Sequence, residues 1–151
     1  IMDTAPIEDA DLDRLCANIR VNLEAAVRMA YTALKHFKAA GSGYLINTSS
    51  ILGTKVRPTA GVYAGSKHGI EALTEALRME VAGSGVRVSC IEPGLVNTEL
   101  QDHFEVHPRD MLGMEQPLEA EDIARCVRFM LEQPPHVSIP RLMVLPSEQA
   151  M

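Results

Sequence analysis

The chain of 151 residues is 46% hydrophobic, enough apolar content for one domain with a sizeable core. Its formal net charge of −6 argues against nucleic-acid binding, because proteins that bind nucleic acids present basic faces. No apolar run is long enough to span a bilayer and no basic amphipathic stretch indicates a membrane surface, so we expect a cytoplasmic protein.

The first predicted element is one long amphipathic helix over about 9–40. Acidic residues after Pro6 suit a helix start, and Gly41-Ser42-Gly43 ends the helix. Apolar residues recur at three- and four-residue steps, at Leu12, Leu15, Ile19, Leu23, Ala26, Val27, Ala30, Leu34 and Phe37. Asn22 interrupts this stripe, and a buried amide there must find hydrogen-bond partners. Taken alone, Asn22 is most simply a structural hydrogen-bonding residue.

Shorter elements of alternating type follow. An apolar run bounded by glycine and serines predicts a buried parallel strand at 44–48. The other expected elements are a helix at 61–82, a strand at 86–91, an aperiodic polar region at 97–117, a helix at 119–132 and a strand at 142–145. This alternation predicts an α/β fold with a parallel sheet and helical crossovers.

The cysteines and histidines predict no metal site. Cys16, Cys90 and Cys126 lie far apart among apolar neighbours, which favours buried thiols in a reducing compartment. His103 and His107 are four residues apart, a spacing that a metal could use, but the surroundings are typical of a loop. Two solvated histidines are therefore the preferred interpretation.

The chemically informative pair is Tyr63 and Lys67, near the start of the second helix. Residues four apart share one helical face, so the Lys67 ammonium is expected beside the Tyr63 phenol. A nearby cation lowers a phenol's pKa from its usual value of about 10 toward a range useful for acid–base catalysis. Alone, the pair is better explained by an ordinary helix face with Lys67 paired to Glu71, because this spacing is common by chance. Ser50 strengthens the catalytic interpretation, because open parallel sheets bind ligands at the carboxyl ends of their strands.

Together these residues resemble the short-chain dehydrogenase/reductase family, over essentially the whole chain. The resemblance is carried by Val21-Asn22-Leu23, Ile46-Asn47-Thr48-Ser49-Ser50 with Gly53, Tyr63-x-x-x-Lys67, Val86-Arg87-Val88 and Pro93-Gly94-x-Val96-x-Thr98. It implies an NAD(P)-dependent oxidoreductase that interconverts an alcohol and a carbonyl on a small substrate. The family's catalytic tetrad falls on Asn22, Ser50, Tyr63 and Lys67.

The resemblance also implies a role for each residue. Tyr63 would exchange a proton with the substrate oxygen, and Ser50 would hydrogen-bond that oxygen. Lys67 would lower the Tyr63 pKa and bind the nicotinamide ribose, while Asn22 would hold a water that links Lys67 to solvent. The rest of the nicotinamide pocket would be formed by Pro93, Gly94, Val96 and Thr98. The hydride chemistry itself belongs to the cofactor, which is expected to be NADP or NAD.

Within the family, segments 121–124, 133–137 and 146–149 resemble a subgroup of NADP-dependent dehydrogenases. That subgroup acts on serine and other 3-hydroxy acids and includes some bacterial aldehyde reductases. The resemblance implies that region 97–117 is the family's substrate-binding loop, for which a mobile lid is expected and a plain surface loop is the alternative.

A Rossmann-type doubly wound sheet opens with a strand and a glycine-rich turn that hold the dinucleotide, and neither precedes the first helix here. Residues 1–151 are therefore expected to be the C-terminal, catalytic portion of one such domain within a longer chain. About three strands and their flanking helices would belong to this portion.

Two other functions stay open. One is a catalytically silent fragment or pseudoenzyme that acts through protein association, and the other is an epimerase or dehydratase using the same Tyr63 and Lys67. The resemblance further implies a homodimer or homotetramer assembled through helices 9–40 and 61–82. Apolar residues beyond one stripe support this expectation, namely Ala25, Val27, Met29, Ala33, Ala72, Ala76 and Met79.

Overall fold

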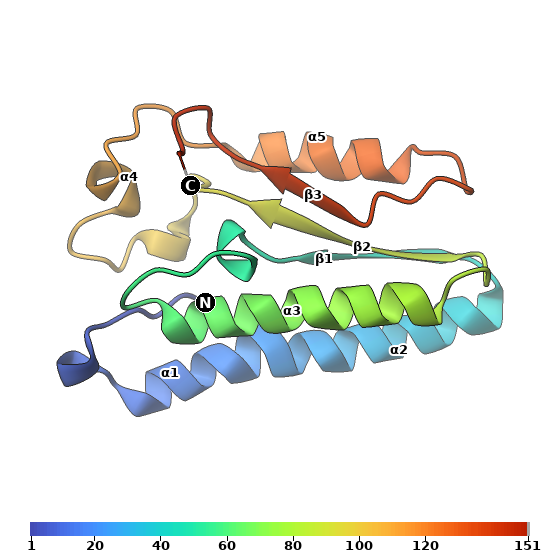
Figure 1. Cartoon of the computed structure of the whole chain (residues 1–151), viewed down its shortest axis with the longest axis horizontal. Helices are drawn as coiled ribbons and strands as arrows, with labels where there is room; N and C mark the ends of the chain where they lie inside the picture. The colour runs from blue at the N-terminus through green and yellow to red at the C-terminus, as the bar shows by residue number, and fades with distance from the viewer. Residues whose placement is uncertain (151) are drawn as a thin grey trace.

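A computed structural model describes residues 1–150, which form an α/β fold (Figure 1). The helices and strands are α1 Leu12–Ile19, α2 Ala25–Ala40, β1 Gly43–Thr48, α3 Gly61–Glu80, β2 Val86–Pro93, α4 Pro108–Met111, α5 Ala120–Leu131 and β3 Arg141–Val144. Short helical turns lie between them, at η1 Ile7–Asp9, η2 Arg20–Glu24, η3 Ile51–Gly53 and η4 Glu99–Gln101.

The three strands form one parallel sheet in the order β1-β2-β3, which confirms the predicted parallel α/β class. In register, Gly43 lies opposite Val86 and Cys90 opposite Arg141. The central strand β2 is buried on both faces along most of its length. The predicted parallel strand at 44–48 is confirmed as β1, but its predicted burial is wrong, because β1 is half-buried and pairs only with β2 within residues 1–150.

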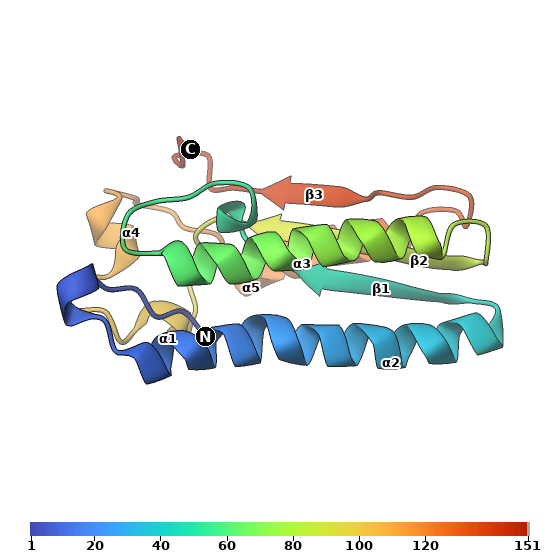
Figure 2. The ribbon, with the colours of Figure 1, turned by 60° about the horizontal axis from the view of Figure 1, so that its bottom comes forward.

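Helices cover both faces of the sheet. The α2 and α3 helices lie on one face and α5 lies on the other (Figures 1 and 2). Along β2, successive side chains point alternately towards the α2 and α3 helices and towards α5. Towards α2 and α3, apolar side chains form a core cluster of Ala30, Leu34, Leu77, Val81, Val86 and Val88.

Arg87 secures α5 on the other face. Its guanidinium group donates to the Gln133 and Val137 carbonyl oxygens at 3.1 and 3.4 Å, and it lies 4.1 Å from the centroid of the Tyr44 ring. These contacts satisfy backbone carbonyl groups in the segment after α5, where no helical hydrogen bond is available to them.

The predicted helix over 9–40 begins later, at α1, and contains a π-helical turn. Asp11 caps α1 by accepting hydrogen bonds from the Asp13 and Arg14 amides at 2.9 and 3.1 Å. The first part of the predicted apolar stripe does not enter the core, since Leu12 is 73% exposed. Asn18 is fully buried instead. The π turn η2 contains Asn22, and such turns are frequent at functional sites.

Other boundaries shift by a few residues. The region 97–117, predicted as an aperiodic loop, contains η4 and α4. Cys90 is buried, but Cys16 is exposed and Cys126 half-buried, so burial of all three thiols is not observed. Within residues 1–150, no helix is long and apolar enough to cross a membrane, and no cluster of three or more His, Cys, Asp or Glu side chains could hold a metal.

Candidate functional site

A cavity of about 410 Å³ opens at the carboxyl ends of β1 and β2. The turn after β1, the start of α3, the segment that follows β2 and the first turn of α5 all contribute to its walls. The cavity brings together all predicted site residues except Asn22, namely Ser50, Tyr63, Lys67, Pro93, Gly94, Val96 and Thr98.

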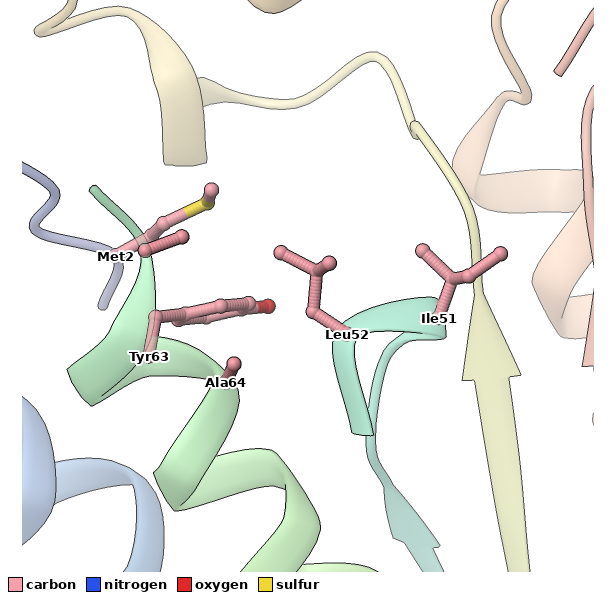
Figure 3. Packing of buried hydrophobic residues seen from close by; sticks show 6 residues of the cluster. Met2, Ile51, Leu52, Tyr63 and Ala64 are labelled. Atoms are coloured by element: carbon pink, nitrogen blue, oxygen red, sulfur yellow. The ribbon is translucent and has the colours of Figure 1, made fainter. Parts of the chain in front are cut away.

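Tyr63 projects from the first turn of α3 towards the turn η3. Its side chain belongs to a core cluster that also contains Met2, Ile51 and Leu52, and the residue is only 6% exposed. Figure 3 shows the Tyr63 hydroxyl pointing towards Leu52 in η3. The phenol is therefore held in an apolar setting with its hydroxyl directed away from α3.

Ser50 ends the extended backbone after β1 and caps η3. Its side-chain oxygen accepts a hydrogen bond from the Leu52 amide at 3.1 Å, which fixes the hydroxyl beside the cavity. The residue is 9% exposed. A Cβ atom at Gly53 would overlap the Ser49 hydroxyl and approach the Glu71 carboxyl, so a side chain there would disturb the turn.

Lys67 lies one turn beyond Tyr63 and reaches back towards β1. Its ammonium group donates to the Thr48 carbonyl oxygen at 3.0 Å and lies 5.8 Å from the centroid of the Tyr63 ring. Burial lowers the pKa of Lys67, and the nearby Cys90 and Glu71 partly oppose this change. The structure thus places both members of the predicted pair in one cavity.

The pKa of Tyr63 is raised, whereas the sequence predicted that Lys67 would lower it. Burial is the larger cause, because an apolar environment disfavours the phenolate, and a hydrogen bond with Ser50 partly opposes it. Lys67 lies over the face of the ring and donates to Thr48. Its charge is therefore not directed at the phenol oxygen alone.

Asn22 does not line the cavity. Its amide nitrogen donates to the Ile1 carbonyl oxygen at 2.7 Å, and its amide contacts the Asn18 side chain at 2.6 Å and the Ser66 hydroxyl at 3.4 Å. Ser66 in turn donates to the Tyr63 carbonyl oxygen at 2.7 Å. Asn22 is thus linked to α3 directly behind Tyr63, through the buried Ser66.

The predicted lid region forms one wall of the cavity. Thr98 caps η4 by accepting from the Leu100 amide at 3.5 Å, and the cavity is also lined by Gln101, Met111 and Leu112. Sequence reasoning named Thr98 but missed the others, as well as Arg57. An apolar or amide residue in an aperiodic segment has no motif that marks it as part of a site.

An ionic cluster of two buried carboxyl groups and one half-exposed guanidinium group joins α3, β2 and β3. The Arg141 Nε atom lies 3.2 Å from a Glu71 oxygen and 2.9 Å from a Glu92 oxygen. Glu92 is fully buried, and Glu71 is 6% exposed. Burial raises the pKa of Glu92, as does the negative charge of Glu71, while Arg141 opposes both effects. One guanidinium group thus faces two carboxyl groups, and the raised pKa of Glu92 favours retention of its proton.

We predict that Glu92→Gln gains stability relative to the wild type as the pH rises. A raised pKa in the folded protein stabilises the fold at low pH, and this contribution is lost as the pH rises above the usual value of 4.5 and through the elevated pKa. The permanently neutral amide of the variant does not undergo this loss. Urea unfolding between acidic and neutral pH measures the difference between the two proteins.

Glu80→Gln is the matched control, since Glu80 is exposed on α3. Its stability difference from the wild type should stay nearly constant over the same pH range. A difference for Glu92→Gln that is equally flat would contradict the raised pKa of Glu92 in the folded protein.

Comparison with known sequences connects this arrangement to one family. Residues 1–108 match the family model described as short chain dehydrogenase. An uncharacterized oxidoreductase of Staphylococcus aureus (strain USA300) is 33% identical over 145 residues, which cover 96% of this chain and 60% of the relative. An uncharacterized oxidoreductase of Staphylococcus saprophyticus is 29% identical over 158 residues. The chain thus spans about 60% of the length of these relatives.

Solved structures give the same result. The closed form of a serine dehydrogenase complexed with NADP+ superposes with a TM-score of 0.91 at 26% identity, covering 99% of this chain and 62% of that one. A serine dehydrogenase from Escherichia coli gives a TM-score of 0.83 at 25% identity, covering 99% and 61%. The three-stranded sheet and its helices therefore correspond to part of a Rossmann fold. The chain belongs to the short-chain dehydrogenase family.

Proposed function

We propose that the protein is an NAD(P)-dependent oxidoreductase that interconverts an alcohol and a carbonyl on a small substrate. The observation that carries the proposal is the convergence of Ser50, Tyr63 and Lys67 on one cavity. Two hydroxyl groups and one ammonium group are the donors needed to position a carbonyl oxygen and to exchange a proton with it. The oxidoreductases and the NADP+-bound dehydrogenase that resemble this chain support the same class of reaction.

The residues of the cavity fit a nicotinamide nucleotide. Pro93, Gly94 and Val96 supply an apolar wall for the flat ring, and Lys67 supplies a donor for the ribose hydroxyl groups. Thr98 adds a hydroxyl group near the carboxamide side. When bound, the nicotinamide supplies or accepts the hydride. The cofactor is NADP or NAD, and the NADP+ bound by the serine dehydrogenase relative favours the former.

The proton step falls to Tyr63. Because burial raises its pKa, the phenol is protonated at neutral pH and is ready to donate to a carbonyl oxygen. Ser50 holds that oxygen, and Lys67 stabilises the phenolate that forms. Asn22 reaches this group through Ser66 and supports the segment of α3 that carries Tyr63. We propose this positioning role alongside the water-holding role that the family resemblance implies.

Residues 1–151 would form the catalytic portion of one Rossmann-type domain. The protein would assemble as a dimer or tetramer through α1–α2 and α3. Exposed methionines on these helices support such a contact, since Met29 is 69% and Met79 60% exposed.

Turnover of the reduced cofactor tests the proposal. The full-length protein is mixed with NADPH or NADH and a panel of small aldehydes and ketones, and the loss of nicotinamide fluorescence is followed. We expect carbonyl-dependent oxidation of at least one of the two cofactors. Cofactor binding without turnover of any panel member would instead favour a catalytically silent protein, and conversion without net change in cofactor would favour an epimerase or dehydratase.

A further inference from the structure

The segment 145–149 follows β3 at the end of the sheet to which all three strands point (Figure 1). Its backbone forms a tight turn, in which the Gln149 amide donates to the Pro146 carbonyl oxygen at 3.0 Å. Leu145 packs against the core cluster that contains Tyr63, and Gln149 lines the cavity. The 145–149 turn is therefore seated beside the proposed reaction centre.

Gln149 holds the wall of the cavity that follows β2. Its side-chain oxygen accepts a hydrogen bond from the Leu95 amide at 3.0 Å. A Cβ atom at Gly94 would overlap that oxygen and would lie 2.9 Å from atoms of Leu145 and Pro146. The turn thus packs directly on the Gly94 backbone, in the wall proposed for the nicotinamide ring.

Glu148 reaches another wall of the cavity, the lid region 97–117. One of its carboxylate oxygens accepts from the Glu115 amide at 2.8 Å and from the Gln116 amide at 3.5 Å. Hydrogen bonds to a carboxylate are stronger than those between neutral groups. Because Glu148 is exposed, water can replace it as a partner of these amides, so the contact positions the lid region without making it rigid.

Glu115 is also held by Arg109 of α4. The Arg109 guanidinium group donates to the Glu115 carbonyl oxygen at 3.0 Å. At the end of the same helix, Met111 and Leu112 line the cavity. A chain of hydrogen bonds therefore runs from Glu148 through Glu115 to the helix that carries the apolar part of the lid wall.

We propose that Glu148 and Gln149 are positioning residues that hold the lid region and the wall after β2 in one arrangement around the cavity. Glu148 acts on the lid region through Glu115, and Gln149 acts on the wall through Leu95. Neither side chain takes part in the proton or hydride step. This inference rests on the proposed oxidoreductase function and adds two residues, both from the 145–149 turn, to its site.

Hydrogen exchange tests the role of Glu148 without turnover. Exchange of the Glu115 and Gln116 amides is followed by nuclear magnetic resonance in the full-length wild type and in Glu148→Ala. We expect about 10-fold faster exchange in the variant, because both amides lose their acceptor. Glu148→Gln keeps a side-chain oxygen and should restore most of the protection. Unchanged exchange in Glu148→Ala would overturn the proposal.

Kinetics and calorimetry separate positioning from support of the fold. Glu148→Ala should raise the KM of the best carbonyl by about 10-fold, because the wall at Met111 and Leu112 is displaced, with NADP+ affinity close to that of the wild type. Gln149→Met should instead weaken NADP+ binding by about 10-fold, because the Leu95 amide loses its acceptor. Methionine has a similar length, so the packing of the turn should remain. A general loosening of the fold would change both quantities in both variants, and that result would overturn the proposal.

Ser147→Ala is the matched control. Ser147 is exposed in the same turn and does not line the cavity. The variant should keep the amide exchange, the carbonyl KM and the NADP+ affinity of the wild type. Effects in Ser147→Ala as large as those in Glu148→Ala would assign them to the turn as a whole and contradict the role of the carboxylate.

The two proposals can fail separately. Faster exchange in Glu148→Ala and weaker NADP+ binding in Gln149→Met, without oxidation of NADPH or NADH by any carbonyl, would contradict the oxidoreductase function alone. Carbonyl turnover by the wild type, with the same carbonyl KM in Glu148→Ala and Ser147→Ala, would contradict only the positioning role.

Discussion

Replacing Tyr63 with phenylalanine is expected to lower turnover by about 100- to 10,000-fold, the range usual for loss of a general acid. The variant keeps the ring that packs against Met2 and Leu52, so the fold and the cavity walls should remain. It loses only the hydroxyl group that exchanges the proton. Steady-state kinetics with the best carbonyl of the panel measure the effect, and calorimetry with NADP+ should give an affinity close to that of the wild type.

Tyr31→Phe is the matched control. Tyr31 is 46% exposed on α2 and does not line the cavity, so this variant should retain wild-type turnover. Activity of Tyr63→Phe within a few fold of the control would rule out Tyr63 as the proton donor.

Lys67→Ala should behave differently from Tyr63→Phe. Lys67 is proposed both to stabilise the phenolate and to bind the ribose, so its loss should weaken NADP+ binding as well as turnover. An unchanged NADP+ affinity in Lys67→Ala would contradict the proposed role of Lys67 in binding the ribose, while its role in stabilising the phenolate could still hold.

The largest effect on stability is expected for Gly85→Ala, in the turn between α3 and β2. Gly85 has a φ of 80°, and a Cβ atom there would overlap the Gly41 carbonyl oxygen. The left-handed backbone costs an alanine about 1 to 2 kcal/mol. The clash adds to this, because it is with backbone that cannot rotate away, so we expect a total loss of about 3 to 4 kcal/mol in the free energy of unfolding.

Gly83→Ala separates the two contributions. Gly83 has a similar φ of 78°, but a Cβ atom there would meet nothing within 4 Å. The expected loss in the free energy of unfolding of Gly83→Ala is the cost of the left-handed backbone alone, about 1 to 2 kcal/mol. Urea unfolding of both variants measures the difference, and equal losses would show that the turn at Gly41 moves freely to admit the methyl group.

The order and type of the main elements follow from local sequence. Helical and strand periodicity placed α2, α3, β2 and α5 close to their observed positions, because apolar spacing and glycine stops act over a few residues. The residues that line the cavity at Ser50, Tyr63 and Lys67 were also identified from the sequence, since each occupies a strand end or a helix start with a fixed spacing. Their catalytic roles remain predictions.

Burial and partners depended on the tertiary structure. The sequence could not reveal that β1 is only half-buried, or that Asn22 contacts Ile1 and Ser66 rather than the cavity. It also predicted a lowered pKa for Tyr63 from one neighbour, whereas the packing of Met2 and the η3 turn around the ring raises it. Desolvation is a sum over all surrounding atoms, and most of these are distant in sequence.

The sequence by itself thus determined the parallel α/β class, the family resemblance and the residues available for proton and hydride chemistry. Only the tertiary structure decided that Arg57 and Gln101 line the same cavity, and that the buried Glu71 and Glu92 carboxyl groups both meet Arg141. The physical reason is that local spacing encodes which residues lie on one helix or strand. Pairing of charges and loss of water depend on contacts between separate elements, which form only when the chain folds.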